Sequence, residues 1–188
     1  ALLDAAVVCE RTGRMQEGER LALDALRAVP EGPGASILRS RSARTAGVCA
    51  MNQSHLDAAE SLMETALSAA RESGDRALAA RCAGSIATLF QVRGDTEQAE
   101  ARYLAALAES RAVGDAAVTA AHLSNLGALL VQMSRHDQAR AIFEEALALP
   151  GGRSDARAEA LLLGNLAVTL RAADRFEEAE RLYRQSIA

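Results

Sequence analysis

A repeat of forty residues is the feature that most constrains what this chain can fold into. Loops at residues 72–75, 112–115 and 152–155 each end in an aspartate, and these aspartates are forty positions apart. A ladder of alanines keeps the same spacing, at Ala59, Ala99, Ala139 and Ala179. A fixed period of this length indicates an array of small units rather than one closed domain. We therefore expect a single array of about five units, at residues 1–34, 35–74, 75–114, 115–154 and 155–188, with the first and last truncated.

Each unit is predicted to be two helices joined by a tight turn. Apolar residues recur at a helical period on both sides of short breaks at Gly13, Ser54, Gly94, Ser134 and Asp174. Alanine supplies 43 of the 188 residues and aromatic residues only 3%, which favours closely packed helices over sheet. We expect the first helices of units two to five at 36–52, 76–93, 116–133 and 156–172, and the second helices at 55–72, 95–111, 136–149 and 175–188.

The loops between units carry helix-end signals. Asp75, Asp115 and Asp155 stand just before a predicted helix, where a carboxylate accepts free backbone N–H groups and opposes the positive end of the helix dipole. Gly74 and Gly114 precede two of them and are suited to end the previous helix at positive φ. These residues are predicted N-caps and C-terminal stops.

The pattern resembles the tetratricopeptide repeat family. That family has a Leu-Gly pair, then an alanine four residues before a phenylalanine, then a proline, and the fourth unit has Leu126-Gly127, Ala139 with Phe143, and Pro150. The period of forty is similar to the long repeats of kinesin light chains, spindle adaptor proteins and large bacterial regulators. The resemblance implies an all-α, right-handed superhelix in which the first helix of each unit lines the concave surface. It also implies a module that binds other proteins.

Charge is sorted between the two sets of helices. All 21 basic residues are arginine and the net charge is −4, which argues against a basic nucleic-acid surface. The predicted first helices of units two to five hold eight Arg and one Glu, whereas the second helices hold fourteen acidic residues and seven Arg. If the first helices line a groove, this groove favours an acidic segment. The alternative is that these arginines neutralise neighbouring glutamates between layers.

Some of these residues occupy the positions that face the groove in the family. Asn125 and Asn165 are forty apart, in a position where the family commonly uses an amide to bond an extended peptide; the alternative is an Asn that bonds within its own repeat. Ser85 and Thr45 hold the earlier positions. The predicted peptide-binding residues are Arg41, Arg44, Thr45, Val48, Arg81, Ser85, Thr88, Gln91, Asn125, Ala128, Gln132, Asn165, Val168 and Arg171.

Several functional classes lack support in the sequence. The three cysteines and three histidines are far apart, so no metal site, disulfide framework or cofactor is expected. Cys9 and Cys49 are predicted to be small buried residues, and His122 to be a packed or solvent-facing residue rather than a catalytic base. No catalytic motif, membrane span or signal peptide is evident, so we expect a cytoplasmic protein without enzymatic activity.

Two functions remain open at this stage. The leading hypothesis is a non-enzymatic module that binds an acidic, partly extended protein segment in its groove. The alternative is a structural or regulatory array, within a larger bacterial regulator, that packs on its own domains or self-associates through its ends. This alternative rests on the last predicted helix, which would leave Leu182, Tyr183 and Ile187 exposed without a polar capping helix.

Overall fold

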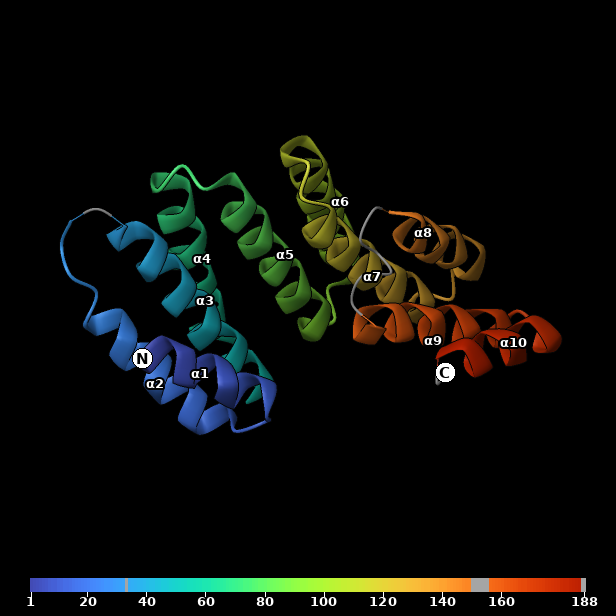
Figure 1. Ribbon diagram of the computed structural model, residues 1–188, viewed down its shortest axis with the longest axis horizontal. Coiled ribbons are helices and arrows are strands. Elements are labelled where there is room, and N and C mark those ends of the chain that lie inside the picture. Colours follow the sequence, from blue (N-terminus) through green and yellow to red (C-terminus); the bar gives the residue numbers. More distant parts are fainter. Residues whose placement is uncertain (33, 150–155, 187–188) are drawn as a thin grey trace. The chain divides into compact units, whose positions relative to one another are not determined.

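The computed structural model describes residues 1–32, 34–149 and 156–186, and over this part of the chain every regular element is a helix (Figure 1). The bounds differ from the predicted ones by no more than two residues, so the all-α helix–turn–helix repeat is confirmed. The helices are α1 (Leu2–Arg11), α2 (Met15–Arg27), α3 (Ala35–Asn52), α4 (Leu56–Glu72), α5 (Arg76–Arg93), α6 (Thr96–Val113), α7 (Ala116–Gln132), α8 (His136–Ala148), α9 (Ala156–Ala172) and α10 (Phe176–Ser186).

All five predicted breaks have the same backbone geometry. Gly13, Ser54, Gly94, Ser134 and Asp174 have φ angles of 79°, 64°, 85°, 59° and 60°. In each turn the following residue donates its N–H to the carbonyl five positions earlier, as His55 does to Ala50 at 2.9 Å and Asp95 to Phe90 at 3.0 Å. This is the Schellman helix end, which requires one residue in the left-handed region. The tight turn within each hairpin is therefore confirmed.

The helix ends between units also match the prediction where they can be seen. Asp75 accepts a hydrogen bond from the N–H of Leu78 at 2.9 Å, and Asp115 accepts one from Val118 at 3.0 Å. Gly74 and Gly114 have φ angles of 73° and 78°. Both aspartates are N-caps and both glycines end helices, as predicted. Asp155 and Pro150 lie outside the described residues.

The chain forms two compact units, residues 1–102 and residues 103–188. In the first unit, α1 contacts α3 and α3 contacts α5; in the second, α7 contacts α9. Among the described residues, no comparable contact joins α2 to α4 or α8 to α10. Helices that approach one another more closely lie on the inner side of a curved stack. Within each unit the first helices therefore form the inner layer and the second helices the outer layer.

In two hairpins, a bulky side chain of the second helix packs on a glycine of the first, Met63 on Gly47 and Phe143 on Gly127. Met63, Tyr103 and Phe143 occupy the same repeat position and are completely buried. Phe143 lies against Gly127, where a Cβ atom would come within 2.5 Å of the Phe143 Cε1 atom. The Leu-Gly pair and the later aromatic residue are thus two halves of one contact.

Substituting Gly127 tests this contact. We expect Gly127→Ala to lower the free energy of unfolding by about 1–3 kcal/mol, because the added methyl collides with a rigid, buried ring. Gly164→Ala is the matched control in a helix of the same type, because its Cβ would meet no atom within 4 Å. It should raise the stability by about 0.5–1 kcal/mol. Urea denaturation of both variants measures the difference, and equal effects would contradict the proposed contact.

Candidate functional site

The inner face of the first unit carries the predicted arginines of α3 and α5. Arg41 and Arg81 are exposed, and Arg44 and Val48 are half-buried. Arg41, Arg44 and Val48 follow a three- and four-residue spacing, so they share one side of α3. Since α3 contacts α5, the basic side chains of both helices lie on the same inner layer.

The alternative prediction is that these arginines pair with glutamates of the neighbouring layer and are neutralised by them. Neither α3 nor α5 contains an acidic residue, and within the described part of the chain Arg41 and Arg44 make no ion pair. Arg93, at the end of α5, behaves differently. It donates to Glu60 at 2.6 Å and to Asp57 at 3.0 Å. Neutralisation between layers therefore describes Arg93, whereas Arg41 and Arg44 keep their charge available.

Arg44 extends from α3 toward α5. Burial raises the pKa of the Cys82 thiol, and the hydrogen bond with Ser40 and the positive charge of Arg44 act in the opposite direction. The Ser40 Oγ and Cys82 Sγ atoms are 3.5 Å apart in the contact between the two helices. The guanidinium of Arg44 is therefore close to both first helices of this inner face.

Of the hydroxyl groups predicted for this face, those of Ser85 and Thr88 bond to their own helix and that of Thr45 is buried. Ser85 donates to the carbonyl of Arg81 at 3.2 Å, and Thr88 donates to Gly84 at 3.1 Å. Thr45 is only 1% exposed, and its hydroxyl has no hydrogen-bond partner among the described residues. Thr45 therefore cannot contact a ligand on the surface, which corrects its assignment as a binding residue. Neighbouring helices bury a position that looks open when α3 is considered alone.

The inner face of the second unit carries the two predicted asparagines. Asn125 is exposed and Asn165 is half-buried. Neither side-chain amide has a hydrogen-bond partner within the described residues, so the alternative of an Asn bonded inside its own repeat does not apply. Because α7 contacts α9, the two amides lie on adjacent helices at the same repeat position. The remaining predicted residues here, Ala128, Gln132, Val168 and Arg171, are exposed.

Sequence reasoning missed one residue of this face. Leu161 lies one helical turn before Asn165 and is 59% exposed. Val168 follows Asn165 at three residues, so an exposed aliphatic side chain lies on each side of the amide. The spacing from Asn165 could have pointed to Leu161, but a leucine in an apolar stretch reads first as a core residue.

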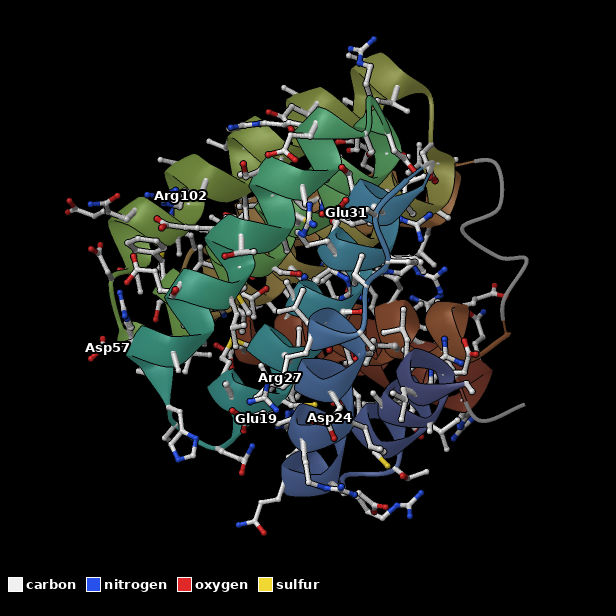
Figure 2. All side chains as sticks on the ribbon, turned by 90° about the vertical axis from the view of Figure 1, so that its left-hand side faces the viewer. Glu19, Asp24, Arg27, Glu31, Asp57 and Arg102 are labelled. Atoms are coloured by element: carbon white, nitrogen blue, oxygen red, sulfur yellow. The ribbon has the colours of Figure 1, made fainter. Side chains whose placement is uncertain are left out.

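The outer layer has a different electrostatic character. Most of its arginines have local partners: Arg27 pairs with Asp24 at 3.1 Å, and Figure 2 shows the two side chains side by side on α2. Arg140 pairs with Glu144 at 2.7 Å, and Arg102 lies 4.1 Å from the centroid of the Phe90 ring. Such exposed pairs are worth little individually. They do show that most arginines of the outer layer have partners within the described residues, whereas the layer keeps an excess of acidic residues.

The cysteines and His122 are packing residues. Cys9, Cys49 and Cys82 are free thiols and at most 2% exposed. Burial, followed by the charges of Glu10 and Glu19, raises the pKa of Cys49 to about 11, so the thiol is protonated at neutral pH. His122 is 4% exposed, with Nδ1 3.4 Å from the Ser110 hydroxyl. The predicted buried role is confirmed for Cys9 and Cys49, and of the two placements predicted for His122 the structure has the packed one.

Other kinds of site are not found in the described part of the chain. No helix there is long and apolar enough to span a bilayer, and no cluster of three or more His, Cys, Asp or Glu residues is arranged to hold a metal ion. A hollow of about 290 Å³ lies between α8, α9 and α10, on the outer side. Its floor is leucine and its charged rim includes the Arg140–Glu144 pair.

A substitution of Thr45 tests whether its buried hydroxyl lacks a hydrogen-bond partner. Thr45→Val keeps the shape and removes an unpartnered buried hydroxyl, so we expect it to raise the free energy of unfolding by about 1 kcal/mol. Thr119→Val is the control, because the Thr119 hydroxyl lies 3.1 Å from Ser110 and donates to the Asp115 carbonyl at 2.8 Å. This second change should lower the stability. Thermal denaturation of the two variants checks the opposite signs.

Comparison with protein families gives one match. The tetratricopeptide repeat model matches residues 85–150 and 118–188, which together exceed half of the chain. No curated protein shows significant sequence similarity.

Solved structures with the same arrangement of helices include three informative examples. BtubC from P. vanneervenii is 24% identical, with a TM-score of 0.74 over 96% of this chain and 75% of its own. The Rap conjugation gene regulator of plasmid pLS20, in complex with the Phr* peptide, is 17% identical, with a TM-score of 0.84 over 99% of this chain. This chain spans 51% of that regulator. A putative kinesin light chain from P. anserina with TPR-like repeats is 14% identical, with a TM-score of 0.70 over 98% of this chain and 91% of its own. At these identities the likeness establishes the fold alone.

Proposed function

The chain belongs to the tetratricopeptide repeat family, and we propose that it binds an acidic, partly extended segment of a partner protein on the inner face of its first helices. Its fold is that of a protein-interaction module. The Rap regulator of similar fold was solved with a peptide bound, which is consistent with a peptide or protein partner here. We propose that this module acts by binding and not by catalysis.

The observation that carries the proposal is the free charge of Arg41 and Arg44. A helix surface with arginines and no acidic residue has a positive potential, and an arginine without a partner can bind a carboxylate with two parallel hydrogen bonds. Arg81 adds to the same potential from α5. An inner face is partly shielded from water, so the potential is screened less than on a convex surface. An acidic segment is the ligand that this face favours.

The free amides of Asn125 and Asn165 support an extended conformation for part of the ligand. One side-chain amide offers a donor and an acceptor, which match the carbonyl and N–H of one peptide unit. A helical segment already uses its backbone groups internally, whereas an extended segment leaves them available. Two such amides on adjacent helices would therefore hold an extended backbone.

Peptide titration tests the proposal. Labelled acidic and basic peptides of equal length are titrated with the protein, and fluorescence anisotropy should show binding of the acidic peptide only. Arg41→Glu combined with Arg81→Glu should weaken this binding at least about tenfold, because two attractive charges become repulsive. Higher salt should weaken it as well, since the contacts are partly exposed.

Arg71→Glu is the matched control for these variants. Arg71 is exposed on α4, in the outer layer, and makes no ion pair among the described residues. Its substitution makes the same type of charge change away from the proposed surface and should leave the affinity unchanged. Equal binding of both peptides, or equal losses in both kinds of variant, would contradict the proposal.

A second candidate function follows from the outer surface of α10. Tyr183 is half-buried, whereas Tyr103 and Phe143 are completely buried at the equivalent positions. Phe176 is 60% exposed, whereas Leu56 at its repeat position packs in a cluster with Leu89. The surface of α10 therefore resembles one that accepts another first helix. We propose as the alternative that this surface packs on other domains or on a second copy.

Sedimentation velocity over a range of concentrations tests this alternative. If copies associate through α10, the sedimentation coefficient should rise with concentration, and Phe176→Glu should abolish the rise because it places a charge in an apolar contact. A constant monomer that still binds the acidic peptide would favour the first function. Glu180→Gln, on an exposed position of α10, serves as the control substitution.

A further inference from the structure

We propose that the bound segment has a second, chemically different part: an uncharged stretch with aliphatic side chains that binds the inner face of α7 and α9. This inference rests on the proposed function, because it adds to the chemistry of the same partner. We call this surface the α7–α9 face. It consists of Ala121, Asn125, Ala128, Leu161, Asn165 and Val168.

The first argument is the absence of charge on α7. None of its seventeen residues is Asp, Glu, Lys or Arg. Its exposed positions nevertheless form one continuous side of the helix, occupied by Ala117, Ala121, Asn125, Ala128 and Gln132. A helix side that faces only water usually carries charged residues. An exposed side with only methyl groups and amides is better suited to contact with another chain.

The second argument is the exposure of aliphatic side chains on α9. Leu161 is 59% exposed and Val168 is 38% exposed, and they are two helical turns apart on the same side. Residues 160–170 of α9 contain no charged residue. Because α7 contacts α9, these side chains lie beside the uncharged side of α7. Covering them removes apolar surface from water, which favours binding.

The third argument is selectivity. A charged residue of the ligand buried against Ala121, Leu161 and Val168 would lose hydration and meet no charged side chain among these residues, whereas an aliphatic residue would lose nothing polar. Arg171 lies three residues beyond Val168, outside the face as defined. The amides of Asn125 and Asn165 can satisfy the ligand backbone between the aliphatic contacts. The inner face of α3 and α5 has the opposite preference, because Arg41 and Arg44 can each form an ion pair with a carboxylate. The inner face of the first unit thus prefers a carboxylate, and that of the second unit prefers an uncharged aliphatic stretch.

The test uses labelled synthetic peptides of equal length and the complete chain. One peptide joins an acidic block to a block of Leu, Val and Ser; a second joins the same acidic block to a block of Ser, Asn and Gly. Each is made in both block orders with a flexible linker. Anisotropy should show that the aliphatic block strengthens binding at least about tenfold, because burial of two partly exposed aliphatic side chains exceeds the cost of ordering the block.

Two sets of variants assign this gain to the face. Leu161→Glu combined with Val168→Glu should remove the gain, which is measured in each variant as the ratio of its affinities for the two peptides. Leu104→Glu is the control, because Leu104 is 50% exposed on α6, outside the face. Circular dichroism verifies that each variant is folded. An aliphatic block that adds no affinity, or a loss of the gain in Leu104→Glu as well, would overturn the inference.

The outcomes separate this inference from the proposed function. If only the acidic block binds, and Arg41→Glu weakens it, the proposed function stands and the inference fails. If the aliphatic block binds through Leu161 and Val168 but Arg41→Glu has no effect, the inference stands and the acidic part of the proposed function fails. If Leu161→Glu instead abolishes concentration-dependent association of the free chain, a second copy covers the face and the inference is overturned.

Discussion

Close packing of a bulky side chain on a small residue is the interaction on which this structure depends. Each helical hairpin has apolar stripes on both helices and cannot bury them alone. Phe143 packs against Gly127 between the two helices of one hairpin. Equivalent positions hold Met63 and Tyr103, which are also completely buried. The bulky residue of this contact recurs every forty positions, which is the period of the repeat in the sequence.

The same packing divides the surface into two layers with different roles. Within each unit the first helices contact one another, whereas over the described residues α2 does not contact α4 and α8 does not contact α10. The inner face is therefore the more closely packed of the two. Acidic residues and their arginine partners lie mainly on the outer face, where water solvates them. Among the described residues, Arg41 and Arg44 make no ion pair on the inner face of the first unit, and Asn125 and Asn165 present uncharged amides on that of the second. A protein that is acidic overall can therefore present a basic surface to a ligand.

The difference between the two inner faces gives the proposed binding its specificity. An exposed arginine binds a carboxylate favourably. A charge buried against an uncharged aliphatic face loses its hydration without gaining a partner, which is unfavourable. A ligand that satisfies both must carry its charges and its aliphatic residues in separate stretches. Fewer ligands meet this requirement than meet the preference of either face alone. The side chains that impose it do not contribute to the hairpin core.

The helices, the five left-handed turns and the Asp75 and Asp115 caps could all be predicted from the residues alone, because they depend on neighbours within a few positions or on one repeated pattern. The sequence also indicated the sorting of charge, since helix membership was enough to count it. Only the tertiary structure decided which side chains are available. Thr45 is buried, Arg93 bridges to Glu60, and Leu161 is exposed. Exposure and pairing depend on residues that are distant in sequence, and a helical period cannot specify how closely neighbouring helices cover each position.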